Sequence, residues 1–371
     1  MSERSVSVGT PVVEGVLSAS DVVATGATIA ATQLDNGMIP WFEGGHCDPW
    51  NHIEAAMALS ACGMWAEAEA AFDWLRHKQL ADGSWFNYYL SNGVKDPRVD
   101  TNVCAYVATG VLHLYRVTCD REVLARYWPM VQAAIDFVLR FQRHDGAVAW
   151  SVDPSGRLES YALLTGSASI YHSLRCAVAI AEEMDQARPD WELAAGRLVH
   201  ALVHHPDAFA RKDEFAMDWY YPVLCGALGA GTARRRLLAG WERFVLAGRG
   251  VRCVAVEDWV TAAETAECVM ALDAAGSKAS ALELFTAGQD LRLGDGSYWT
   301  GVVYPARVTF PHSEKTTYTA AAMVLAADAL SGATGASGLF RGEGLPAAVE
   351  LAEVNCALGA SKCSARQGLA E

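Results

Sequence analysis

The stretch QLADGSWF, residues 79–86, has the composition of a helix end, a tight turn and an aromatic that packs. Related stretches occur at TQLDNGMIPW (32–41), FQRHDGAVAW (141–150) and GQDLRLGDGSYW (288–299). Each contains a glutamine, then Asp or Asn followed by glycine, and then a tryptophan. We interpret the glutamine as the end of an outer helix and the Asp-Gly or Asn-Gly pair as the turn that reverses the chain. The tryptophan is expected to pack back on the helices.

Segments rich in Ala and Leu, with helical spacing of their apolar residues, fill the chain between these stretches. Segments 101–118 and 167–184 are apolar on almost every side, which is typical of buried helices, whereas 121–142 and 190–205 each keep a polar face. The alternation predicts twelve helices in six hairpins, with six apolar helices inside a ring and six amphipathic helices outside. The predicted fold is therefore an all-α (α/α)6 barrel.

The barrel is predicted to span residues 15–331 as one catalytic domain. Residues 1–14 are expected to form a flexible N-terminus, and residues 332–371 a peripheral tail rich in Gly and Ala. Strand signals are sparse, and 251–256 and 300–310 are the only candidates.

Composition excludes several classes of protein. The formal net charge of −14 argues against nucleic acid, whose phosphates need a basic face, and against an anionic membrane surface. The ten cysteines form no CxxC pair, and no apolar run is long enough for a membrane span. We therefore expect a cytoplasmic protein with reduced thiols. No ligand spacing or phosphate loop suggests a metal or nucleotide cofactor, so none is expected. The oligomeric state stays open, a homodimer included.

Acidic residues recur just before each predicted inner helix, where a ring would bring all six connections to one mouth. They are Asp48, Asp100, Glu159, Asp218, Glu257 with Asp258, and Glu314. Helix capping is an alternative role for Asp100 and Asp258. Aromatic residues accompany the acids: Trp50, Trp219, Tyr220, Tyr221, Trp259, Trp299, Tyr304 and Tyr318. Carboxylates beside flat aromatic faces suit a sugar, and glycoside cleavage needs two carboxylates.

Glu257 and Asp48 are the predicted catalytic pair. Glu257 follows the apolar run VAV, and apolar surroundings raise a carboxyl pKa as a general acid requires. Asp48 lies in the polar stretch GGHCDPWNHIE and is expected to be the base that activates water. Asp100 and Asp218 are the reserves. The other residues expected to bind the substrate are His46, Trp50, Asn51, Asp100, Asp218, Trp219, Tyr220, Asp258, Trp259 and Tyr318. A metal site at His46, Asp48 and His52 is disfavoured, because His52 falls in or beside a helix and no HExxH spacing occurs.

The repeated stretches resemble the QW motif of terpene-cyclase and protein-prenyltransferase toroids, in which Gln and Trp are structural. Together with GGHCDPWNHIEAAMALS, DPRVDTNVCAYVATGV and VEDWVTAAETAE, they make residues 15–331 similar to the mycobacterial methylmannose polysaccharide hydrolase family. The resemblance implies an endo-acting α-1,4-mannanase that cuts a cytoplasmic polysaccharide of partly methylated mannose. It maps the catalytic roles onto Asp48 and Glu257.

Three other classes remain open at this point. A terpene cyclase or prenyltransferase would need DxDD, DDxxD or a zinc set, and the sequence contains no DxDD or DDxxD motif and no clear zinc set. A sugar epimerase or polysaccharide lyase could use the same barrel, and paired His46 and His52 would serve an epimerase. A toroid that binds sugar without catalysis is the third.

Overall fold

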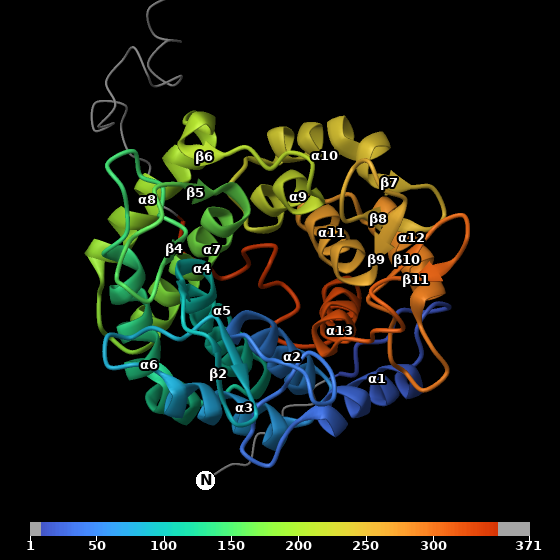
Figure 1. Ribbon diagram of the computed structural model, residues 1–371, viewed down its shortest axis with the longest axis horizontal. Coiled ribbons are helices and arrows are strands. Elements are labelled where there is room, and N and C mark those ends of the chain that lie inside the picture. The colour runs from blue at the N-terminus through green and yellow to red at the C-terminus, as the bar shows by residue number, and fades with distance from the viewer. Residues whose placement is uncertain (1–8, 348–371) are drawn as a thin grey trace, which may run out of the picture.

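The computed structural model describes residues 9–347. Six inner helical segments, one of them divided into two helices, surround the centre of the molecule (Figure 1). Each inner segment contacts the next one in the chain, and the last contacts the first, so that the helices form a closed ring. In chain order these helices are α2 (Pro49–Ala61), α4 (Thr101–Ala105) with α5 (Val107–Thr118), α7 (Leu164–Glu183), α9 (Ala216–Leu224), α11 (Ala262–Ala274) and α13 (Thr317–Ser331).

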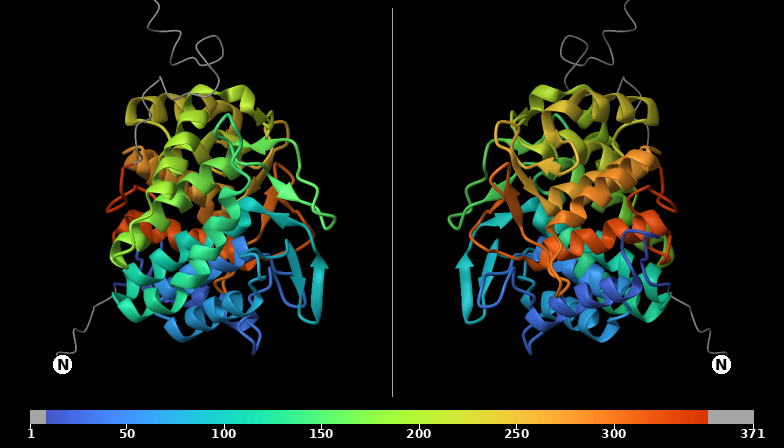
Figure 2. Two further views of the ribbon diagram at one scale, coloured as in Figure 1. Left: turned by 90° about the vertical axis from the view of Figure 1, so that its left-hand side faces the viewer. Right: turned by 90° about the vertical axis from the view of Figure 1, so that its right-hand side faces the viewer.

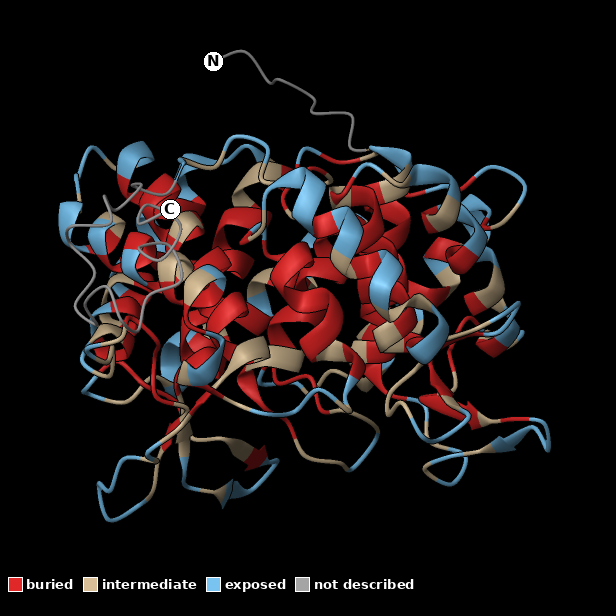
Figure 3. Ribbon diagram, turned by 90° about the horizontal axis from the view of Figure 1, so that it is seen from above, coloured by how far each residue is buried: buried red, intermediate tan, exposed pale blue. Residues whose placement is uncertain are grey.

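The outer helices each pack against one to three inner helices. They keep exposed faces, whereas the inner helices are buried almost throughout (Figure 3). They are α1 (Ala19–Thr32), α3 (Trp65–Lys78), α6 (Arg121–Leu139), α8 (Pro189–His204), α10 (Ala230–Phe244) and α12 (Lys278–Gly288). Segments 101–118 and 167–184 lie in the inner ring as predicted, although the first is interrupted at Tyr106.

Short strands add to the expected all-α fold, both at the two candidate segments 251–256 and 300–310 and beyond them. All described strands lie in connections that run from an outer to an inner helix, and Figure 2 shows them gathered at one face. The largest sheet is antiparallel, in the order β11-β10-β9-β8-β7. The strands are β1 (Tyr88–Leu90), β2 (Gly93–Asp96), β3 (Val99–Asp100), β4 (Ser151–Val152), β5 (Ala162–Leu163), β6 (Phe209–Ala210), β7 (Val245–Leu246), β8 (Gly250–Arg252), β9 (Trp259–Thr261), β10 (Gly301–Val303) and β11 (Val308–Thr309). The prediction of a mostly helical fold is confirmed. The strands supply hydrogen-bond partners to backbone groups that would otherwise have none in these long connections.

The glutamines of the repeated stretches tie neighbouring outer helices together. The Gln79 Nε2 group donates to the carbonyl of Gly83 at 3.0 Å and to the carbonyl of Met130, in α6, at 2.9 Å. Gln33 makes the same pair of bonds to its own turn and to α3, and Gln142 to its own turn and to α8. Gln289 stays local, and the Thr25 hydroxyl of α1 instead donates to the Gly296 carbonyl at 2.8 Å. The motif therefore links one hairpin to the next around the ring.

The glycines of these turns are required by both conformation and space. Gly37, Gly83, Gly146 and Gly296 all have φ between +90° and +97°. A Cβ at Gly83 would lie 2.1 Å from the Ala133 carbonyl oxygen, closer than any such contact allows. The turn therefore lets the backbone of one hairpin touch the outer helix of the next.

Replacing Gly83 by Ala is expected to destabilise the protein more than replacing Gly156 by Ala. Gly156 has a similar φ of +83° but nothing within 4 Å of its added Cβ, so the control variant suffers the left-handed backbone alone. That conformation costs about 1–2 kcal/mol, and overpacking against Ala133 should add about 1–3 kcal/mol. Urea denaturation of the two variants measures the difference. Equal unfolding free energies would contradict the role of the close approach.

The other end of the ring is closed by the chain after α13, which corrects the expected peripheral tail for residues 333–347. Ala336 and Leu339 are buried, and the Leu339 carbonyl accepts a hydrogen bond from His172 Nε2 at 3.2 Å. Phe340 stacks on the His172 ring with centroids 5.0 Å apart. Arg341 pairs with the buried Asp273 at 2.5 Å. Gly and Ala in this segment indicate close packing rather than disorder. The remainder of the predicted tail and residues 1–8 lie outside the described residues.

Candidate active site

The inner helices begin at the face that carries the strands, because every outer-to-inner connection passes through it (Figure 2). Asp48 is the N-cap of α2, and Asp100 is the N-cap of α4. The arrangement agrees with the predicted convergence of these acids on one face. The term mouth is used below for a group of five residues at this face. They are Trp41, Asp48, Trp50, Glu264 and Tyr318.

Both carboxylate oxygens of Asp48 are held by donors. The Asn51 backbone N–H donates to Oδ1 at 3.0 Å, while Trp41 Nε1 and Asn51 Nδ2 donate to Oδ2 at 2.6 and 2.8 Å. Burial raises the pKa of Asp48, and these hydrogen bonds oppose that rise. Three donors therefore fix the position of this carboxylate.

Aromatic rings surround Asp48. The Trp41 ring lies edge-on to Tyr318, with centroids 5.0 Å apart, and 4.3 Å from the His46 ring. Tyr88 meets both Trp41 and His46 edge-on. These rings are all half-buried, so part of each is accessible to a ligand. The sequence-based list contained His46 and Tyr318 but missed Trp41 and Tyr88. Trp41 ends the first repeated stretch only seven residues before Asp48, and that spacing was the available signal.

Glu264 supplies a second carboxylate at the mouth that the sequence-based list missed. It lies in the first turn of α11 and is half-buried. Helix α13, which carries Tyr318, contacts both α11 and α2. Burial first, and then the negative charges of Glu264, Glu314 and Asp48, raise the pKa of Tyr318. Tyr318 therefore lies within electrostatic reach of both Glu264 and Asp48.

Glu257 occupies a different environment from the one predicted. It lies in the turn between β8 and β9 and is exposed, and the preceding Val256 is 81% exposed. The expected apolar enclosure is therefore wrong. The run VAV was interpreted as a buried segment, whereas its last valine is a turn residue that points to solvent. The catalytic role assigned to Glu257 stays a prediction.

Asp100 repeats the arrangement of Asp48 and confirms its alternative role as a cap. Its Oδ1 accepts from the backbone N–H groups of Asn102 and Val103 at 2.8 and 3.2 Å, and Trp150 Nε1 donates to Oδ2. Burial raises the pKa of Asp100 to about 6. The capping alternative is wrong for Asp258, which is exposed and accepts from Arg252 Nε at 2.8 Å, since Thr261 is the N-cap of α11.

The predicted residues of α9 face other parts of the protein. Trp219 is 6% exposed, and its Nε1 donates to the Arg236 carbonyl in the outer helix α10 at 2.9 Å. Tyr220 is fully buried, and its hydroxyl donates to Glu267. Asp218 accepts from the Thr165 hydroxyl at 2.6 Å. Trp219 and Tyr220 are therefore buried in the packing of α9 against α10 and α11.

The remaining predicted residues have mixed environments. Trp259, on β9, is half-buried and donates from Nε1 to the Phe310 carbonyl at 3.1 Å. His52 is buried: its Nδ1 accepts from the Ile39 N–H and its Nε2 donates to the Ala71 carbonyl. Burial lowers the pKa of His52 to about 4. Both ring nitrogens are thus engaged by backbone, which leaves His52 unsuited to metal binding or to the paired-histidine chemistry of an epimerase. Within residues 9–347, no group of three or more His, Cys, Asp or Glu side chains is placed to hold a metal ion.

A buried pair of carboxyl groups lies one helical turn below the mouth. Glu54 accepts from Trp50 Nε1 at 2.9 Å and from the Tyr106 hydroxyl at 3.2 Å. Glu267 accepts from the hydroxyls of Tyr220 and Tyr221. Burial first, and then the charge of Glu267, raise the pKa of Glu54. Burial raises the pKa of Glu267 to about 7. Glu54 therefore holds Trp50 at the mouth, and burial favours the protonated form of both carboxyl groups.

The raised pKa of Glu267 predicts a pH-dependent effect of Glu267→Gln on stability. The pKa of Glu267 is about 4.5 in the unfolded chain and about 7 in the folded protein. Between pH 4.5 and pH 7 the folded state therefore binds more protons than the unfolded state, and the free energy of unfolding falls as pH rises. Glutamine has no charge to desolvate and avoids this loss. The unfolding free energy of the variant, relative to the unmodified protein, should therefore rise by about 1–3 kcal/mol from pH 4.5 to pH 8. Glu283→Gln, at an exposed position of α12, is the matched control and should show no such trend in denaturant titrations.

None of the described helices is long and apolar enough to cross a membrane. No family model matches the sequence. The chain is 51% identical over 352 residues to the MMP endo-(1,4)-3-O-methyl-alpha-D-mannosidase of Mycolicibacterium hassiacum, an alignment that covers 95% of this chain and 97% of that protein.

Solved structures of similar fold include a glycosidase in complex with glucose, with a TM-score of 0.65 and 16% identity over 85% of this chain and 98% of that one. A D-mannose isomerase gives a TM-score of 0.63 at 10% identity over 83% and 96% of the two chains. At these identities the likeness shows the fold alone.

The helical ring, with its carboxylates and half-buried aromatic rings at one face, and the close relative together define an enzyme of the glycoside hydrolase class. The extent of the identity then decides the family. The chain belongs to the methylmannose polysaccharide hydrolase family.

Proposed function

We propose that the protein hydrolyses internal α-1,4 linkages of a polysaccharide of 3-O-methylated mannose. The observation that carries this proposal is the 51% identity, over 95% of the chain, to a mannosidase whose name states that specificity. The closed cycle of helix contacts supports assigning the fold to the (α/α)6 barrels. Every cysteine of the described part is a free thiol, which supports the expected cytoplasmic location.

The aromatic rings at the mouth suit a methylated sugar. Sugar rings and O-methyl groups present apolar C–H surface, which stacks on flat rings and is favourably removed from water. Trp41, Tyr88 and Tyr318 are half-buried and lie around Asp48, so a sugar that contacts them lies against that carboxylate. An endo-acting enzyme needs such contacts on both sides of the scissile bond, and the half-buried Trp50 adds a further ring, which packs on the buried rings of Tyr106 and Tyr221.

Asp48 and Glu264 are proposed as the catalytic pair, with Glu264 in place of the predicted Glu257. The fixed Asp48 carboxylate would accept the proton of a water molecule as that water attacks the anomeric carbon. Glu264 would donate its proton to the glycosidic oxygen as the bond to the leaving sugar breaks. The two residues come from helices on either side of α13, which favours the wider separation of about 6.5–9.5 Å that admits a water and inverts the anomeric centre.

The test is a time-course assay with the purified full chain. A 3-O-methylated α-1,4-mannose polysaccharide should yield new reducing ends, and size-exclusion profiles of early samples should show fragments of intermediate length. Unmethylated α-1,4-mannooligosaccharides of the same length serve as the matched substrate control and should react more slowly. Release of single sugars alone would contradict endo action. Equal rates on both substrates would contradict recognition of the methyl groups.

A further inference from the structure

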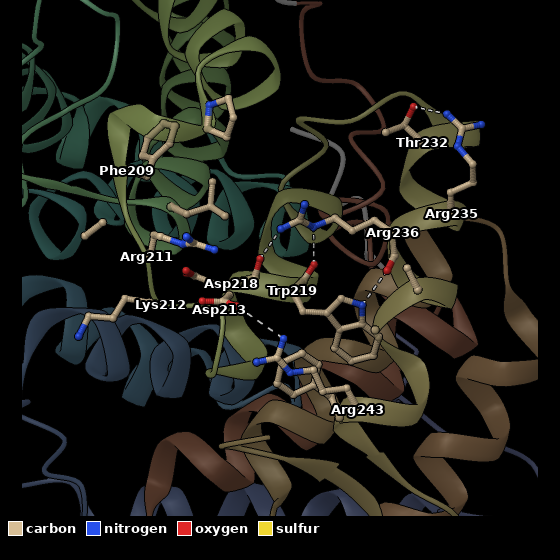
Figure 4. A pocket seen from close by; sticks show the side chains of 16 residues that line it. Phe209, Arg211, Lys212, Asp213, Asp218, Trp219, Thr232, Arg235, Arg236 and Arg243 are labelled. Carbon is tan, nitrogen blue, oxygen red and sulfur yellow. Dashed lines mark hydrogen bonds and ion pairs between the residues drawn. The ribbon is translucent and has the colours of Figure 1, made fainter. Parts of the chain in front are cut away.

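A second pocket, of about 610 Å³, lies between the loop 206–213 and the outer helix α10 (Figure 4). None of the five residues that define the mouth lines it. Its volume is within the range of about 300–1,000 Å³ that is typical of sites for small molecules. The pocket is therefore large enough to hold a ligand of its own.

Positive charge concentrates around this pocket. Its lining contains five basic residues and two acidic ones, although the chain as a whole has a formal net charge of −14. The acidic residues are Asp213 and Asp218. The basic residues, several of which point toward the space in Figure 4, are Arg211, Lys212, Arg235, Arg236 and Arg243. In an acidic protein such a concentration attracts anions to one place.

Arg236 is fixed in the wall of the pocket. Its Nε donates to the Trp219 carbonyl at 2.8 Å and its Nη2 to the Asp218 carbonyl at 2.6 Å. Burial lowers the pKa of Arg236, and the negative charge of Asp218 compensates for this only in part. A bound anion would supply that compensation, because hydrogen bonds that involve a charged partner are the strong ones.

The other cations are largely available. Arg235 donates to the Thr232 hydroxyl at 3.0 Å, and Arg243 lies 3.7 Å from Asp213, a loose and exposed ion pair. In the described part of the chain, Arg211, Lys212 and Arg235 take part in no ion pair with a carboxylate. Exposed guanidinium groups of this kind can bind two phosphate oxygens at once, whereas a neutral sugar has no negative charge with which they could pair.

We propose that this pocket binds the di- or triphosphate group of a small organic molecule. Five cations against two acids leave three positive charges, which match the charge of a diphosphate more closely than that of a single carboxylate. The apolar side chains of Leu164 and Phe209 in the lining can accommodate the organic part of the ligand. The site shares none of the five residues that define the mouth and serves binding rather than hydrolysis.

Isothermal titration calorimetry of the full chain with pyrophosphate and with ADP tests the proposal. Both probes should bind at low salt and weaken as salt rises. The double variant Arg211→Gln/Arg235→Gln should weaken both by at least about tenfold, since two charge-assisted contacts are lost. Arg234→Gln removes an exposed arginine of the same helix that does not line the pocket, and should change affinity less than about twofold.

Three results would overturn the proposal: no binding of either probe at millimolar concentration, equal weakening by Arg234→Gln and the double variant, or binding of pyrophosphate without ADP. The last would show a pocket that accepts an inorganic ion only. All the substituted residues lie outside the mouth. Polysaccharide hydrolysis and thermal unfolding of the variants therefore report whether they remain folded.

Discussion

Asp48→Asn is expected to lower turnover of the methylated polysaccharide by about 10²–10⁴-fold, the usual contribution of a positioned acid or base. Asparagine keeps an oxygen that can cap α2 through the Asn51 N–H, but it has no charge with which to accept a proton from water. Its amide nitrogen would face the two donors that now reach Oδ2, from Trp41 and Asn51. We therefore expect a loss of about 1–3 kcal/mol in unfolding free energy as well. Initial rates at saturating substrate, beside urea denaturation, separate the two effects.

Asp100→Asn is the matched control for that variant, because Asp100 is also an N-cap and also accepts from a tryptophan of a repeated stretch. It should lose a similar amount of stability but keep turnover within about tenfold. Near-native turnover of Asp48→Asn would remove Asp48 from the mechanism. A larger loss of turnover in Asp100→Asn than in Asp48→Asn would transfer the role to Asp100.

Glu264→Gln is expected to lower turnover by a similar factor of about 10²–10⁴, while Glu257→Gln changes it by less than about threefold. Glu264 lies in the first turn of an inner helix beside Tyr318, whereas Glu257 is exposed in a turn. Glutamine keeps the size and polarity of both side chains, so folding should be preserved in both variants. A leaving group that needs no protonation separates the roles further: an activated aryl glycoside should recover much of the rate in Glu264→Gln but not in Asp48→Asn. The reverse pattern, with Glu257→Gln inactive and Glu264→Gln active, would restore the sequence-based assignment.

The ring of helices could be predicted because its signals are local. The Gln and Gly of the repeated stretches recur where each hairpin must meet the next, and the bonds of Gln33, Gln79 and Gln142 give the pattern its physical cause. The apolar composition of residues 101–118 likewise predicts a helix with no exposed face. The strands were harder to foresee, since they are only two to four residues long and depend on pairing with distant connections.

The candidate site was predictable only in part, because sequence places a residue in a connection without giving its direction. Asp48 was identified from its connection and lies at the mouth. Trp219 and Tyr220 belong to a similar connection, but α9 turns them into the protein interior. Glu264 lies inside a helix rather than in the connection before it, so its sequence position does not indicate a place at the mouth. The contacts of α11 with α13 bring it toward Tyr318. Phe340 and its neighbours were predicted as tail because Gly and Ala are common to loops and to closely packed segments.

In the proposed reaction, water activated by Asp48 attacks the anomeric carbon directly while Glu264 protonates the leaving oxygen. The measurement that tests it most directly is the ¹H NMR spectrum of product formed from the methylated α-1,4-mannose polysaccharide, recorded before the new reducing ends mutarotate. Direct attack by water on the α-linkage should give the β-anomer first, and the α-anomer should appear later. Initial formation of the α-anomer would show retention and contradict direct attack by water.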